Sequence, residues 1–142
     1  MRFVKPLVAA TLALSLCAAS AMAEVVAVVS TRSSLTTLTK NQVTDIFLGK
    51  TSRFPDGSQA IPIDQVEGSA ARDEFYAAVA GKSAAQIKAY WSKIIFTCRG
   101  SPPREMQNNS EVKKFLGENL AAIGYIDKSE LDSSVKVLKI SP

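Results

Sequence analysis

An alternation of β-branched strand patterns with capped helix patterns constrains the fold of this chain most. Residues 24–30 (EVVAVVS) form a nearly continuous β-branched run, which suits a strand covered on both faces, as in a parallel sheet. Residues 59–64 alternate in polarity and predict a second strand, which Pro62 suggests to be short or at an edge. Residues 122–126 (AIGYI) and, more weakly, 135–140 predict two further strands.

Helix patterns fill the segments between these strands. Four stretches have the apolar spacing of a helix: 40–48, 70–80, 84–96 and a short one capped by Ser110. Capping boxes begin two of them, at Thr39–Gln42 and at Ser83–Gln86. The longest apolar stripe belongs to 84–96, and we expect all of it to face the core: Ile87, Tyr90, Trp91, Ile94 and Ile95. Strands alternating with helices predict an α/β domain with a mostly parallel sheet flanked by helices.

The first 23 residues have the pattern of a secretory signal peptide. Arg2 and Lys5 precede an uncharged apolar run at 7–17, and Ala21-Met22-Ala23 supplies a small-x-small cleavage site. A membrane-spanning anchor would need about 20 apolar residues. A lipoprotein attached at Cys17 is disfavoured because Leu16 is not small. We therefore expect a periplasmic protein with one domain, residues 24–142.

The composition argues against catalysis and metal binding. The chain has no His, which removes Ser-His-Asp and Cys-His catalysis and His-containing zinc sites. We predict no catalytic residue, no metal and no cofactor. The domain has 15 basic and 13 acidic residues, which gives no reason to expect binding to nucleic acid. Cys98 is its single thiol, and such a thiol is usually buried and inert or pairs between molecules.

A turn after the second predicted strand is the first candidate for a binding site. The strand ends near Asp64, Gly68 permits a tight turn, and Ser69 begins the next helix. The first N–H groups of a helix have no partner within it, and the helix dipole attracts anions to that end. The Ser69 hydroxyl could donate to an oxyanion, or it could simply cap its own helix.

Three segments together give a family resemblance. They are Asp45–Lys50 followed by Arg53–Gly57, then Glu67-Gly68-Ser69 ahead of Phe75-Tyr76, and finally 122–126. In order and spacing they are similar to the phosphate ABC transporter substrate-binding proteins, the periplasmic phosphate receptors. Those receptors have two lobes and need roughly twice this length. The resemblance implies a single periplasmic-binding-protein-like lobe that is no enzyme and has phosphate or a similar oxyanion as its ligand.

The resemblance also points to ligand-binding residues: Glu67, Gly68, Ser69 and Ala70. In the receptors this turn reads Asp-Gly-Ser-Gly-Thr, with an Arg just ahead. Here Gln65 stands in the place of that Arg, and Ala70-Ala71 replace Gly-Thr. Arg72 could supply the missing charge, or it could pair with Asp73, Glu74 or solvent.

Other arginines are also candidates for binding an anion. Arg99 and Arg104 flank a stiff loop, and guanidinium groups bind oxyanions with two hydrogen bonds. Arg32, with Ser33 and Ser34, follows the first strand and could face the same crevice. A solvated loop is the alternative for each.

Two functions remain open from the sequence. One is a module that binds an oxyanion weakly and is accessory to phosphate uptake or sensing. The other is an envelope interaction or scaffold protein, with a membrane or envelope partner, that has lost its ligand. The loss of the receptor Arg and Thr at Gln65 and Ala71 favours the second.

Overall fold

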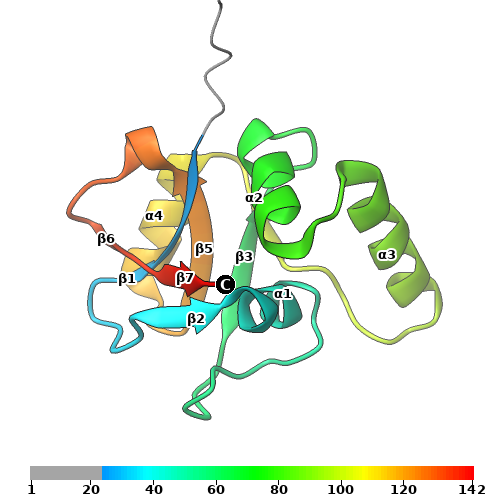
Figure 1. Cartoon of the computed structure of the whole chain (residues 1–142), viewed down its shortest axis with the longest axis horizontal. Helices are drawn as coiled ribbons and strands as arrows, with labels where there is room; N and C mark the ends of the chain where they lie inside the picture. The colour runs from blue at the N-terminus through cyan, green and yellow to red at the C-terminus, as the bar shows by residue number, and fades with distance from the viewer. Residues whose placement is uncertain (1–23) are drawn as a thin grey trace, which may run out of the picture.

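A computed structural model describes residues 24–142 of the chain, so the predicted signal peptide lies outside the described residues (Figure 1). The elements follow in this order: β1 (Val25–Ser30), β2 (Thr37–Thr39), α1 (Lys40–Phe47), β3 (Ile61–Gln65), α2 (Ala70–Ala80), α3 (Ala84–Phe96), β4 (Arg104–Met106), α4 (Asn109–Glu118), β5 (Ala122–Asp127), the 3-10 helix η1 (Lys128–Glu130), β6 (Val135–Val137) and β7 (Lys139–Ser141). The predicted α/β domain is confirmed.

The central sheet has five strands in the order β4-β3-β5-β1-β6. β3 is parallel to both of its neighbours, whereas β1 is antiparallel to β5 and β6. The sheet is therefore mixed, and the prediction of a mostly parallel sheet is wrong in this respect. The β-branched run of β1 indicates that both faces of this strand are buried. It does not indicate whether the neighbouring strands are parallel or antiparallel. A separate small sheet pairs β2 with β7 in parallel.

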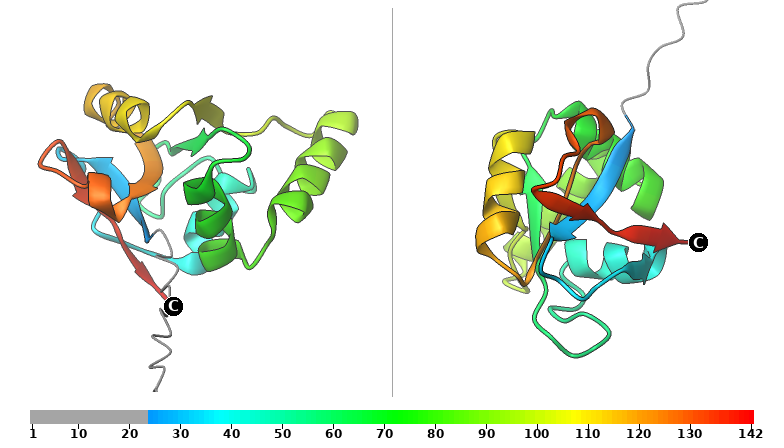
Figure 2. Two further views of the ribbon diagram at one scale, coloured as in Figure 1. Left: turned by 90° about the horizontal axis from the view of Figure 1, so that it is seen from above. Right: turned by 90° about the vertical axis from the view of Figure 1, so that its left-hand side faces the viewer.

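Helices cover both faces of the central sheet (Figures 1 and 2). Residues of α1, α2 and α3 form the larger core cluster on one face, and residues of α4 pack on the other. β5 shows the division clearly, because Ile123 and Tyr125 join the first cluster while Ala122 and Ile126 join the second. None of the helices within residues 24–142 is long and apolar enough to cross a membrane.

Pro62 predicts a strand that is short or at an edge, and the structure shows the first alternative, because β3 has five residues but is an interior strand. β3 runs between β4 and β5, and the backbone N–H of Ile61 donates to the carbonyl of Ala121 beside β5. The Pro62 nitrogen therefore faces β4, whose pairing with β3 begins only at Ile63. The missing donor of Pro62 costs no ladder hydrogen bond at this position.

Three further predictions differ from the structure. Asn108, not Ser110, caps α4, because its side chain accepts the backbone N–H of Glu111 at 3.0 Å. The strand predicted over 135–140 is divided at Leu138 into β6 and β7, which belong to different sheets. Ile95 of the predicted core stripe is 54% exposed, although Ile87 and Trp91 of the same stripe are buried.

Candidate functional site

The predicted turn lies at the carboxyl end of β3 and leads into α2. Gly68 has a φ of +91°, a conformation that other residues rarely adopt. Ser69 is the N-cap of α2, and its hydroxyl accepts the backbone N–H of Arg72 at 3.4 Å. The backbone amides of Ala70 and Ala71 have no hydrogen-bond partner within residues 24–142. These two amides are the donors that this turn offers to an anion.

The buried carboxylate of Asp64 lies near the end of β3, just before this turn. It is 2% exposed and accepts hydrogen bonds from the hydroxyls of Tyr125 and Tyr76, the latter at 2.6 Å, and from the backbone N–H of Gln65. Burial, and then the charge of Asp64, raise the pKa of both tyrosines far above the ordinary value. Both hydroxyls therefore stay protonated and act as donors to the carboxylate.

Arg72 is occupied by the same carboxylate. Its Nε lies 3.6 Å from Oδ2 of Asp64, and its guanidinium lies 5.8 Å from the ring centre of Tyr76. The expected alternatives, pairing with Asp73, Glu74 or solvent, are therefore wrong. Because the charge of Arg72 is balanced by Asp64, an anion at the turn meets no net positive charge from this pair.

Gln65, which stands in place of the receptor Arg, has a fully bonded side chain. Its Nε2 donates to the backbone carbonyl of Tyr125 at 3.1 Å and to Oδ1 of Asn109 at 2.9 Å. A carbonyl can only accept, so the amide nitrogen must face Tyr125 and the amide oxygen must face Ser69. Ser69 then donates its hydroxyl hydrogen to Oε1 of Gln65, at 3.2 Å. The hydroxyl predicted to bind an oxyanion thus has an internal acceptor.

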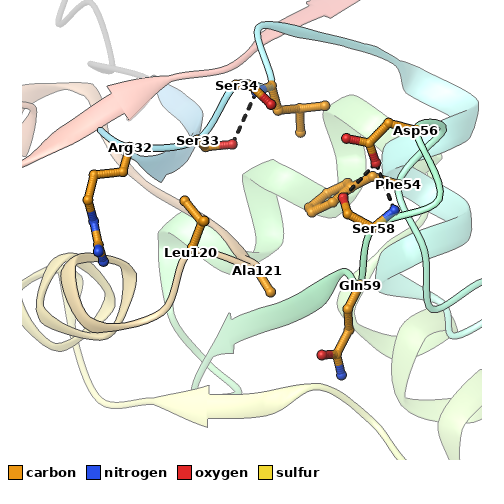
Figure 3. Close-up of a pocket in the computed structure, with 10 residues that line it drawn as sticks. Arg32, Ser33, Ser34, Phe54, Asp56, Ser58, Gln59, Leu120 and Ala121 are labelled. Atoms are coloured by element: carbon orange, nitrogen blue, oxygen red, sulfur yellow. Dashed lines mark hydrogen bonds between the residues drawn. The ribbon is translucent and has the colours of Figure 1, made fainter.

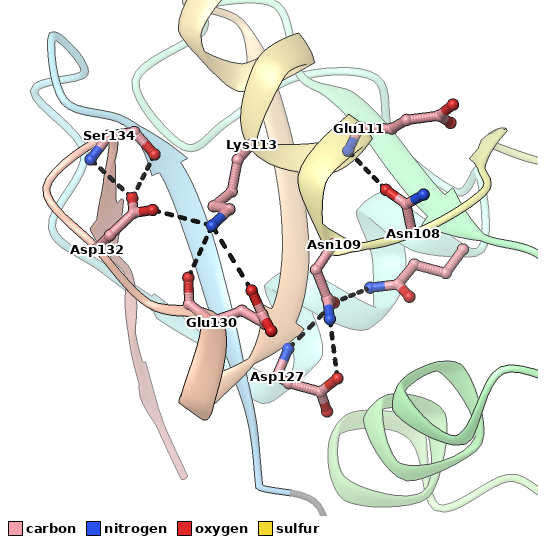
Figure 4. Close-up of polar contacts among 9 residues, drawn as sticks. Asn108, Asn109, Glu111, Lys113, Asp127, Glu130, Asp132 and Ser134 are labelled. Atoms are coloured by element: carbon pink, nitrogen blue, oxygen red, sulfur yellow. Dashed lines mark hydrogen bonds and ion pairs between the residues drawn. The ribbon is translucent and has the colours of Figure 1, made fainter.

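Asn109 connects this turn to the end of β5 (Figure 4). Its Nδ2 donates to the carboxylate of Asp127 at 2.9 Å, and its Oδ1 also accepts the backbone N–H of Asp127 at 3.3 Å. The carboxyl ends of β3 and β5 are therefore joined to the start of α4 through the side chains of Gln65 and Asn109.

Glu67 is exposed at the tip of the turn. Its carboxylate lies 3.4 Å from Nζ of Lys88, and both side chains are largely solvated. Such a surface pair contributes little to stability. The charges of Glu67 and Lys88 cancel each other beside the turn, as those of Arg72 and Asp64 do.

Arg99 and Arg104 do not join the turn. Arg104 lies opposite Ile63 in the sheet, and its guanidinium is 5.4 Å from the ring centre of Phe115 of α4. That contact is on the other face of the sheet from the Asp64–Arg72 pair. Arg99 lies beyond the end of α3, whose last residue, Phe96, is eight positions after Lys88. At 1.5 Å per residue the helix therefore ends roughly 12 Å farther along its axis than Lys88.

Arg32 and its serines lie at the opposite edge of the sheet from Ser69. β1 is antiparallel to β5, so its carboxyl end reaches the amino ends of β3 and β5. The expected shared crevice is therefore wrong. Figure 3 shows the pocket there, of about 290 Å³, whose lining includes Arg32, Ser58 and Leu120.

The sequence reasoning missed Asp64 and Asn109 as structural partners of the turn. A lone acidic residue inside an apolar strand is the signal that could have identified Asp64. Cys98 is exposed, contrary to the common buried case. Within the described part of the chain, no group of three or more His, Cys, Asp or Glu side chains could hold a metal ion.

Known structures of similar fold exist, although no family model and no curated protein sequence matches the chain. A candidate phosphate ABC transporter substrate-binding protein with bound phosphate from Clostridium perfringens matches over 82% of this chain, with a TM-score of 0.64 and 22% identity. An ABC-type phosphate transport receptor from Vibrio cholerae also matches over 82%, with a TM-score of 0.65 and 19% identity. The matches cover 44% and 45% of those proteins. The chain therefore has the fold of about half of a phosphate ABC transporter substrate-binding protein, which corresponds to one lobe.

Proposed function

We propose that this domain is a non-enzymatic binding module that holds phosphate or a similar oxyanion weakly at the start of α2, accessory to phosphate uptake or sensing. The observation that carries the proposal is the pair of unpartnered amides, Ala70 and Ala71, beyond the carboxyl end of β3. Their position in a fold matched by a structure with bound phosphate supports an anion at this end of the helix.

The affinity follows from the groups that are left to bind the anion. Arg72 and Ser69 have internal partners, Asp64 and Gln65, so the donors available are backbone amides on an open face. Water competes for each of them. The absent receptor Arg removes a charge-assisted hydrogen bond, which is worth roughly 1.5–3 kcal/mol, or a factor of about 10 to 100. We therefore expect a dissociation constant on the order of millimolar.

Titration calorimetry with inorganic phosphate on residues 24–142 tests the proposal. Weak, saturable heat is the expected result, and chloride at the same ionic strength serves as the control. Micromolar affinity would contradict the argument from an open face and balanced charges.

The second function is an envelope interaction or scaffold protein without a ligand. The hydrogen bond from Ser69 to Gln65 favours it, because an internal acceptor takes the hydroxyl that an anion would use. Absence of phosphate heat at every concentration, from a folded sample, would select this function over the first.

A further inference from the structure

The last turn of α3 carries apolar side chains that the core does not use. Phe96 is 90% exposed and Ile95 is 54% exposed. Phe96 lies nine positions after the buried Ile87, and at about 100° per residue this places it on the opposite side of the helix. We refer to Ile95 and Phe96 as the α3 tip.

The tip belongs to a segment of the chain that is rich in basic residues. Residues 75–104 contain no acidic residue and five basic ones: Lys82, Lys88, Lys93, Arg99 and Arg104. The remaining residues of 24–142 carry ten basic and thirteen acidic side chains, so the rest of the domain is net negative. The domain thus has one basic segment on an otherwise acidic body, and α3 lies in the middle of that segment.

Two of these cations lie next to the tip. Lys93 precedes Phe96 by three positions and Arg99 follows it by three; both side chains are exposed, and neither forms an ion pair within the described residues. Lys88, by contrast, pairs with Glu67 near the other end of the helix. Figures 1 and 2 show α3 at the outer side of the molecule, away from α4 and β6.

The charge and size of this surface select its partner. A second copy of the domain would bring two basic segments together, which is unfavourable. A specific protein interface needs about 800 Å² per partner around an apolar centre. The outer face of α3 behind the tip offers only small or polar exposed side chains, such as Ala85, Ala89 and Ser92. Docking on a bilayer requires a smaller apolar area than a protein interface does. Shallow burial of a few apolar side chains is enough when nearby cations contact anionic headgroups.

We propose that the α3 tip docks on a membrane surface that contains anionic phospholipids. Phe96 and Ile95 enter the interface between headgroups and acyl chains, and Lys93 and Arg99 contact the lipid phosphates. The contact is peripheral, and it is separate from the turn at Ser69, so it stands whether or not that turn binds an anion.

Co-sedimentation of residues 24–142 with vesicles tests this docking. We expect binding to phosphatidylcholine vesicles that contain phosphatidylglycerol, little binding to phosphatidylcholine alone, and loss of binding as salt is raised. Phe96→Asp should weaken binding about tenfold. Lys93→Gln should weaken it about fivefold. The matched controls, Leu120→Asp and Lys114→Gln, change exposed residues elsewhere and should leave binding unchanged.

Cys98 provides a second readout because it is the single thiol of residues 24–142 and is exposed two positions after Phe96. An environment-sensitive fluorophore on Cys98 should shift to shorter wavelength with the anionic vesicles. Equal binding to both vesicle types, or anionic binding that Phe96→Asp and Lys93→Gln leave intact, would overturn the proposal. A solution dimer abolished by Phe96→Asp would assign the tip to a second copy. Binding to polyglutamate without binding to vesicles would assign it to an acidic protein.

Discussion

The hydroxyl of Ser69 donates a hydrogen bond to Oε1 of Gln65, across 3.2 Å at the start of α2. The orientation of the Gln65 amide is fixed by its two donor contacts, to Tyr125 and Asn109, so this bond cannot be reversed by a simple rotation of the amide. An anion at the turn must therefore compete with a neutral internal acceptor for the Ser69 hydroxyl.

Removing this internal acceptor should tighten phosphate binding. Gln65→Met keeps the side-chain volume but deletes Oε1, so the Ser69 hydroxyl becomes free to donate to phosphate. The same change removes the two hydrogen bonds that Nε2 donates to Tyr125 and Asn109. A hydrogen bond to a charged group is worth about 1.5–3 kcal/mol, so we expect the dissociation constant to fall about tenfold. Calorimetry measures the change, and thermal unfolding confirms that the variant is folded.

The double variant Gln65→Met/Ser69→Ala separates this mechanism from a general rearrangement of the turn. Without the Ser69 hydroxyl, the affinity gained by Gln65→Met should disappear. Tight binding that persists in the double variant would show that the gain comes from another group.

We expect the stability of the folded domain to fall at high pH because of the two tyrosines that contact Asp64. Burial, and then the Asp64 charge, raise the pKa of Tyr76 and Tyr125 well above the ordinary value of 10.0. Below pH 10 both states keep these protons, so the tyrosines add no pH dependence there. Above pH 10 the unfolded chain loses the protons while the folded protein keeps them, and the free energy of unfolding falls by about 1.4 kcal/mol per pH unit for each tyrosine. Urea unfolding between pH 9 and pH 11 measures this slope.

Tyr76→Phe is the matched control for the alkaline effect. It removes one of the two titrating hydroxyls, so the slope above pH 10 should be about half that of the parent. A slope unchanged by this substitution would mean that Tyr76 ionises normally in the folded state.

Trp91 is predicted to anchor α3 on the domain. It is 6% exposed, and its ring packs so closely on Gly49 that a Cβ at that position would lie 3.2 Å from Cη2 of Trp91. Trp91→Ala should lower the free energy of unfolding by about 3–5 kcal/mol. Lys93→Ala, an exposed position in the same helix, should change it by less than about 0.5 kcal/mol. Equal melting temperatures for the two variants would contradict the anchoring role.

Cys98 occupies a backbone conformation that suits glycine. Its φ is +54°, and the amides of Cys98 and Arg99 bond to the carbonyls of Ile95 and Ile94, which closes α3 in a Schellman motif. Cys98→Gly should therefore raise the free energy of unfolding by about 1 kcal/mol. Cys98→Ala also removes the thiol but keeps a Cβ, so it should not give this increase. Chemical denaturation of both variants under reducing conditions makes the comparison.

Local chemistry explains what the sequence predicted correctly. The capping boxes at Thr39–Gln42 and Ser83–Gln86 form as expected, because each needs only residues three positions apart. The helix start at Ser69 is predictable for the same reason. Asn108 was missed as the cap of α4 because Asn and Ser both cap helices, and only the structure shows which side chain reaches the backbone.

Long-range geometry explains what the sequence could not give. Arg72 pairs with Asp64 because Tyr76 and Tyr125 enclose that carboxylate, and Tyr125 is 60 positions away from Gln65 in the chain. Ile95 follows the apolar spacing of α3, yet it is exposed because the rest of the domain packs only against the part of the helix that carries Ile87 and Trp91. Whether an apolar stripe is buried depends on how its neighbours pack, and periodicity does not report this.

The most direct measurement is a phosphate titration of residues 24–142 followed by backbone amide chemical shifts in NMR spectra. If the start of α2 binds the anion, the amides of Ala70 and Ala71, with Gly68 beside them, should show the largest shifts. The shifts should follow one dissociation constant, on the order of millimolar. Shifts confined to Arg99, to Arg104 or to the residues around Arg32, with Ala70 and Ala71 unmoved, would contradict the site.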